Sequence, residues 1–141
     1  MVLEAGGEGC ELRAAAEAAV ILLDTHAAIW LAQGHKRTRT LERFPRIYLS
    51  PVSVLEIQFL VEAGRLRLSD GHSPMTLAND ARWRFDEPPS TKWFLEACDL
   101  SWTRDPFDRL LAAHARLRGW RLATADNLLL ERLAPSEVLP L

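Results

Sequence analysis

Two aspartates stand where apolar segments end, which is a common place for chemistry in proteins with parallel sheets. Asp24 follows the apolar run at residues 20–23, and Asp126 follows the segment 121–124 closely. Ligands of open α/β sheets bind outside the carboxyl ends of the strands. If both segments are parallel strands, we expect Asp24 and Asp126 at one edge of one sheet.

Two further carboxylates are predicted to lie on inward faces of helices. Glu56 falls on an apolar stripe, and Asp108 precedes apolar residues three, four and seven positions later. The stripe around Glu56 consists of Val52, Leu55, Phe59, Leu60 and Ala63. A carboxylate that faces a core is costly unless it is paired or binds a metal. The helix of Glu56 contains no lysine or arginine, which favours a metal over a local ion pair. An arginine brought in by the fold remains the alternative.

Helix capping is the competing interpretation for the other acidic residues. Asp105 before Pro106 is a standard N-cap with proline in the first helical position. Asp108 could complete a capping box with it, and Asp24 and Asp126 could each cap a following helix. Each carboxylate alone is therefore weak evidence for a site, whereas their coincidence at strand ends and inward helix faces is stronger.

Carboxylates gathered at one edge would raise one another's pKa values, and divalent cations would relieve the repulsion. Oxygen ligands favour Mg²⁺ or Mn²⁺ over zinc. Such a site activates water for attack on a phosphodiester and needs no nucleophilic serine or cysteine. The four histidines include no close pair, and the chain has no glycine-rich phosphate loop. Arg104 and Arg109 flank Asp105 and could contact phosphate.

The net charge of −2 argues against a generic nucleic-acid binder. Without the five candidate acidic residues the rest of the chain carries a charge of +3, since −2 + 5 = +3, and it could therefore attract phosphate. Lys36 and Arg37 lie in a predicted basic loop. Trp83, between the exposed Arg82 and Arg84, is the tryptophan that we consider for base stacking.

Strands are expected at residues 20–23, 47–49, 121–124 and 138–139, alternating with helices at about 25–31, 51–63, 75–85, 90–98 and 105–117. Residues 64–68 are expected to be a short extended segment or a loop. This alternation is typical of an α/β domain whose central parallel sheet has helices on both faces. We expect one domain at residues 20–141, preceded by an extension at residues 1–19 that includes a possible short helix.

The two cysteines match no metal or redox spacing, and no apolar run approaches a membrane span. The first twenty residues lack the order of charge and apolar residues of a signal peptide. The expected location is the cytoplasm.

Several segments resemble the PIN-domain family, and in particular its VapC-like toxins. They are residues 22–27 with Trp30, residues 50–57 with 64–66, residues 104–113, and residues 122–126. The resemblance spans residues 20–141 and implies a PIN-like fold. By the resemblance, Asp24, Glu56, Asp108 and Asp126 would be metal-site and catalytic carboxylates, and Asp105 would be auxiliary.

The resemblance also implies an activity and partners. It implies Mg²⁺- or Mn²⁺-dependent endoribonuclease cleavage, a VapB-like antitoxin that inhibits the toxin, and a homodimer. Two features depart from the pattern: Leu60 stands where many relatives carry lysine, and the chain has the extension before residue 20.

Two other functions remain open. One is a PIN-like RNA-binding or scaffold protein that does not cleave. The other is a phosphotransfer or phosphatase domain with Asp24 as nucleophile; it would require a second aspartate two positions later, where His26 stands.

Overall fold

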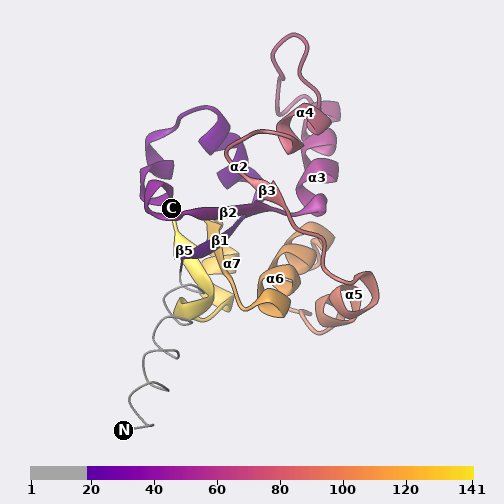
Figure 1. The fold of residues 1–141 in the computed structure, drawn as a ribbon. Coiled ribbons are helices and arrows are strands. Elements are labelled where there is room, and N and C mark those ends of the chain that lie inside the picture. The colour runs from indigo at the N-terminus through magenta and orange to yellow at the C-terminus, as the bar shows by residue number, and fades with distance from the viewer. Residues whose placement is uncertain (1–18) are drawn as a thin grey trace, which may run out of the picture.

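The computed structural model describes residues 19–141, which form an α/β domain around a five-stranded sheet in the order β3-β2-β1-β4-β5 (Figure 1). All neighbouring strands pair in parallel. The strands are β1 (Val20–Leu23), β2 (Arg46–Leu49), β3 (Arg84–Phe85), β4 (Arg121–Thr124) and β5 (Val138–Pro140). The extension predicted before residue 20 lies almost wholly outside the described residues.

Helices cover both faces of this sheet, as predicted. The helical elements are α2 (Thr25–Ala32), the 3-10 helix η1 (Lys36–Arg43), α3 (Pro51–Glu62), α4 (Pro74–Ala78), α5 (Ser90–Cys98), α6 (Pro106–Arg118), α7 (Asn127–Arg132) and the short 3-10 helix η2 (Pro135–Glu137). Within residues 19–141, no helix is long and apolar enough to cross a membrane.

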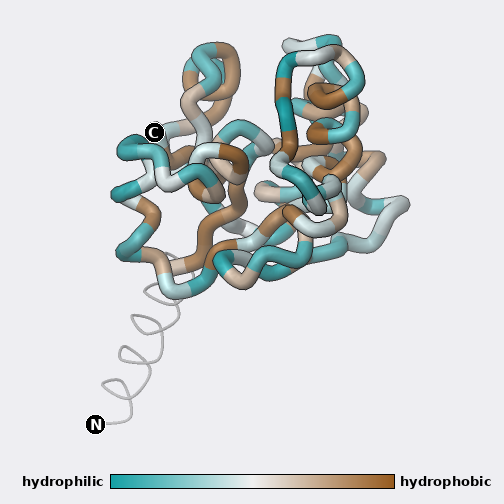
Figure 2. Tube along the Cα trace, turned by 90° about the horizontal axis from the view of Figure 1, so that it is seen from above, coloured by the Kyte–Doolittle hydropathy of each residue, from teal (hydrophilic) through white to brown (hydrophobic). Residues whose placement is uncertain are grey.

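The sheet separates two hydrophobic cores. Successive residues of a strand point to opposite faces, so Leu22 packs against α5, α6 and α7, whereas Ile21 and Leu23 pack against α2 and η1. Because both faces are covered, β1 is buried along its whole length, which explains its continuous apolar sequence. Hydrophilic residues are most frequent in the outer loops of the tube in Figure 2.

The helix predicted at residues 75–85 is wrong beyond Ala78. The Asp80 carboxylate accepts a hydrogen bond from the Arg82 backbone N–H at 2.8 Å, and this local bond competes with helix continuation. The Trp83 side chain is 5% exposed, and its Nε1–H donates to the Ala78 carbonyl at 3.2 Å. Trp83 is therefore a core residue whose ring is not free to stack on a base. Arg84 then begins β3 beside β2.

The segment predicted as a basic loop after α2 is the 3-10 helix η1. His35 caps it by accepting the Arg37 backbone N–H on Nδ1 at 3.1 Å.

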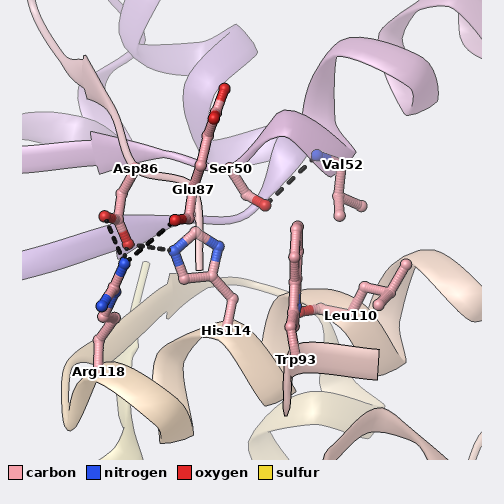
Figure 3. Close-up of polar contacts among 8 residues, drawn as sticks. All are labelled: Ser50, Val52, Asp86, Glu87, Trp93, Leu110, His114 and Arg118. Carbon is pink, nitrogen blue, oxygen red and sulfur yellow. Dashed lines mark hydrogen bonds and ion pairs between the residues drawn. The ribbon is translucent and has the colours of Figure 1, made fainter. Parts of the chain in front are cut away.

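A polar network joins α6 to the segment that follows β3 (Figure 3). His114 is fully buried, and its Nε2 lies 2.7 Å from an Asp86 oxygen. Arg118 Nε donates to the same oxygen at 2.8 Å. Burial lowers the pKa of His114. Burial alone would raise the pKa of Asp86, but the hydrogen bonds from Arg118 and His114 lower it overall. An ionised Asp86 can only accept, so His114 Nε2 carries the proton.

We expect Asp86→Ala to lower the free energy of unfolding by about 2 kcal/mol, because it leaves the fully buried Nε2–H donor of His114 without its acceptor. Urea unfolding at neutral pH measures this loss.

Glu137→Ala is the matched control, because its ion pair with Arg116 is more exposed on both sides and is expected to contribute less than about 1 kcal/mol. Equal losses in the two variants would mean that the Asp86 network does not anchor α6.

Candidate metal centre

All five candidate carboxylates line one cavity at the carboxyl ends of β1 and β4. Its volume is about 100 Å³. It is lined by Asp24, Thr25, His26, Glu56, Asp105, Asp108, Leu111 and Asp126. The structure therefore brings together residues that lie as far apart in sequence as Asp24 and Asp126.

The central strands position the first two aspartates. Leu23 and Ala123 are partners in the parallel pair β1–β4, so the residues that follow them emerge side by side. The Asp24 N–H donates to the Ala123 carbonyl at 3.0 Å. The Thr124 hydroxyl donates to Asp24 Oδ2 and accepts the Asp126 backbone N–H at 3.0 Å. Thr124 therefore links the two aspartates. Thr124 was not among the predicted site residues, although a hydroxyl two residues before a strand-end aspartate could have indicated its contact with Asp126.

Capping and site formation prove compatible for three of the acidic residues. Asp24 accepts the Ala27 backbone N–H at 2.7 Å, and Asp126 accepts that of Leu129 at 3.0 Å. Asp105 caps α6 by accepting the Phe107 N–H at 2.8 Å. In each case the cap occupies one carboxylate oxygen and fixes the side chain.

Asp108 does not form the capping box considered for α6. The Asp105 N–H donates instead to the Thr103 hydroxyl at 3.2 Å. Among the described residues, the Asp108 carboxylate has no hydrogen-bond or ion-pair partner, although it lies in the first turn of α6, where the helix dipole favours negative charge.

Glu56 reaches the cavity from a different face of α3 than the one predicted. Leu55 and Phe59 are 52% and 50% exposed, and of the proposed stripe only Val52 is buried. The inward residues are Val52, Ser53 and Ile57. Glu56 lies one helical turn after Val52 and Ser53, so it shares their face. The Thr25 hydroxyl donates to that of Ser53 at 3.0 Å, which holds α2 against α3 beside the cavity.

Within residues 19–141 the Glu56 carboxylate has no cationic partner. In this part of the chain its Oε2 is buried without a hydrogen-bond partner, and no ion pair includes it. The alternative in which the fold brings an arginine to Glu56 is therefore not realised within residues 19–141.

Burial and like charge make the cavity electrostatically unfavourable when it holds only carboxylates. Burial, with the charges of Asp105, Asp108 and Asp24, raises the pKa of Glu56 to about 7. Burial, with the charges of Asp105, Asp126 and Asp24, raises the pKa of Asp108 to about 7. Burial also raises the pKa of Asp24, against hydrogen bonds from Thr124 and Ala27.

The donor set fits a hard divalent cation. Every candidate ligand is a carboxylate oxygen, as Mg²⁺ and Mn²⁺ prefer, and the orphaned Glu56 Oε2 needs a positive partner. Within residues 19–141, no three acidic, histidine or cysteine side chains already converge as a complete metal site. Asp108 and the Oε2 atom of Glu56, which accept no hydrogen bond from these residues, would have to adjust to a cation.

The basic residues considered for RNA contact fall into separate places. Arg104 is exposed near the start of α6, whereas Arg109 Nε is occupied by the Thr103 carbonyl at 2.7 Å. Lys36 is exposed on η1, and Arg37 lines a hollow next to the acidic cavity.

Arg82 and Arg84 are not brought to the acidic cavity. Arg82 pairs with Asp80 at 2.6 Å. Both arginines line another hollow, beside Arg46, that shares no residue with the cavity.

We expect metal-free Glu56→Gln to melt at a higher temperature than the wild type at about pH 8, by about 3 °C or more. The pKa of Glu56 rises from 4.5 to about 7 on folding. Its contribution to stability is therefore complete below about pH 4.5 and is lost as the pH rises through about 7. The difference between variant and wild type should shrink toward about pH 5, and calorimetry across this range measures it.

Glu62→Gln on the exposed end of α3 is the control and should change the melting temperature by less than about 1 °C. Mn²⁺ should stabilise the wild type more than Glu56→Gln. A Gln variant that is less stable at every pH would instead indicate a structural role for the Glu56 charge.

The chain is similar in sequence to known proteins. The sequence model of the PIN domain family matches residues 21–134. Ribonuclease VapC22 of Mycobacterium tuberculosis is 30% identical over 128 residues, which cover 84% of this chain and 95% of that protein.

Two solved structures share the fold. A toxin–antitoxin complex from Klebsiella pneumoniae contains a chain with a TM-score of 0.61 and 17% identity, covering 84% of this chain and 95% of that one. VapBC2 from Rickettsia felis, bound to a DNA fragment from its promoter, contains a chain with a TM-score of 0.59 and 14% identity, covering 85% and 96%.

Proposed function

Because the chain belongs to the PIN domain family, we propose that it is an endoribonuclease of the VapC type, the toxin of a toxin–antitoxin pair. It hydrolyses phosphodiester bonds of RNA and depends on Mg²⁺ or Mn²⁺. The observation that carries the proposal is the cavity in which five carboxylates meet and one oxygen, Glu56 Oε2, is buried without a partner.

Asp24, Glu56, Asp108 and Asp126 would hold the cation, with Asp105 as an auxiliary carboxylate. A divalent cation in such a site lowers the pKa of bound water and stabilises the charge that develops on the phosphate. Among residues 19–141, no cysteine lines the cavity, and the Thr25 hydroxyl there donates to Ser53. This lining favours water as the nucleophile.

The four carboxylates divide into a fixed pair and an adjustable pair. Asp24 and Asp126 are held by helix N-termini and by Thr124, which preorganises one side of the site. Asp108 and Glu56 Oε2 have no such restraint within the described chain. Glu56 Oε2 is thus the atom best placed to accept a proton from the attacking water.

Protein partners belong to the same proposal. The two structural neighbours come from toxin–antitoxin complexes, and we propose a VapB-like antitoxin as inhibitor, a homodimer as the assembly and the cytoplasm as the location. Large apolar side chains that are at least half exposed would serve protein contacts. They are Leu55, Phe59, Met75, Phe94 and Leu95.

We expect Asp108→Asn to reduce Mg²⁺-dependent cleavage of RNA by about 100-fold or more, since the loss of a cation ligand removes several kcal/mol of transition-state stabilisation. Purified protein is incubated with total RNA in Mg²⁺ or in chelator, and the cut ends are mapped. Asp99→Asn, an exposed residue at the end of α5, is the control and should cut like the wild type.

Full activity of Asp108→Asn, or cleavage that persists in chelator, would refute the assignment of this site. RNA that is bound but never cut by the wild type would indicate a non-cleaving RNA-binding or scaffold protein.

A further inference from the structure

A second hollow of about 240 Å³ adjoins the acidic cavity. Both are lined by Asp24, His26 and Asp126, and the second is lined in addition by Trp30, Arg37 and Ala125. We propose that this hollow, the Trp30–Arg37 subsite, binds the RNA nucleotide next to the bond that is cleaved. Arg37 holds a phosphate, and the base packs beside Trp30 and His26. This inference rests on the proposed ribonuclease function.

Trp30 is held rigidly at this position. It lies on α2, and its carbonyl accepts the His35 backbone N–H at 2.9 Å. The His35 ring stacks on it, with ring centres 5.5 Å apart and planes at 27°, and the His26 ring is tilted against it at 6.4 Å. An aromatic group fixed at the edge of a site binds a base with little loss of conformational entropy.

The Arg37 side chain packs on Trp30 and keeps its positive charge unpaired within residues 19–141. Its guanidinium carbon lies 5.1 Å from the centre of the Trp30 ring, a cation–π distance. No carboxylate of residues 19–141 forms an ion pair with it, and the side chain is exposed. A guanidinium that no carboxylate neutralises keeps N–H donors free, and these match two phosphate oxygens.

The charge distribution also favours RNA at this place. The segment Lys36–Arg43 carries four cationic side chains and one carboxylate, and its Arg37 lines the hollow that adjoins the cavity with five carboxylates. A polyanion would be repelled by the carboxylates alone, whereas the basic segment attracts its backbone up to the edge of the cavity. The phosphate to be cleaved then lies over the carboxylates and the adjacent phosphate at Arg37.

The test measures binding of a short fluorescent single-stranded RNA to the Asp108→Asn chain in Mg²⁺, by anisotropy at several salt concentrations. Arg37→Gln should raise Kd about tenfold and reduce the slope of log K against log salt by about 0.7, the effect of one lost phosphate contact on a single strand. Trp30→Leu should raise Kd about fivefold or more with an unchanged slope. In the otherwise wild-type chain, both changes should raise KM by similar factors.

Arg39→Gln is the matched control. It removes the same charge from the same 3-10 helix, but Arg39 does not line the hollow, so its Kd should rise less than about threefold. Arg84→Gln probes the separate hollow beside Arg46. If Trp30→Leu fails to fold, the exposed Arg37 still tests the subsite.

The results distinguish a failure of the proposed subsite from a failure of the proposed ribonuclease function. RNA that is cut by the wild type, with Arg37→Gln and Trp30→Leu both behaving like Arg39→Gln, would overturn the subsite and leave the ribonuclease intact. A large loss confined to Arg84→Gln would overturn it by placing RNA at the other hollow. A wild-type chain that neither binds nor cuts RNA would overturn both proposals.

Discussion

Repulsion among carboxylates at the ends of β1 and β4 is the constraint on which the rest of the site depends. Folding confines five of them around about 100 Å³, and burial raises the pKa values of Glu56 and Asp108 to about 7. Helix N-termini compensate part of this cost at Asp24, Asp105 and Asp126, because backbone N–H groups bind one oxygen of each. The part of the repulsion that these N–H groups do not offset can be relieved either by protonation of a carboxylate or by a bound cation. In the proposed function a divalent cation relieves this repulsion and is also the agent of hydrolysis.

Features that depend on local sequence could be predicted. Buried parallel strands are continuous apolar runs, so β1 and its following Asp24 could be recognised without a structure. The N-cap at Asp105 followed from proline at the next position. Glu56 shows how far apolar periodicity can place a residue. Its place at the cavity was predicted, but from an apolar stripe in which Leu55 and Phe59 prove to be half exposed. The apolar residues of α3 lie all around the helix, so periodicity alone could not identify its inward face.

Features that depend on long-range contacts could not be predicted. The hydroxyl of Thr124 meets Asp24 across 100 positions of sequence, and the His114–Asp86 contact spans 28. The local sequence marks Thr124 only as a hydroxyl near Asp126, and it does not identify the distant partner in either pair. Trp83 was misjudged for a similar reason, since the adjacent arginines indicated an exposed segment, whereas pairing of β3 with β2 buries the ring between them. These contacts hold α6 and the strand ends in place, so the candidate metal centre relies on interactions that are seen only in the folded chain.

A crystal structure of the wild-type chain grown with Mn²⁺ and measured at the manganese absorption edge tests the central claim most directly. The account predicts an anomalous peak in the acidic cavity, with oxygens of Asp24, Glu56, Asp108 or Asp126 at roughly 2.0–2.3 Å, the range of hard-cation ligands. It also predicts that Glu56 Oε2 has acquired the Mn²⁺ ion or a water bound to it as its partner. A cavity without anomalous density at saturating Mn²⁺, with Glu56 Oε2 still unpartnered, would contradict it.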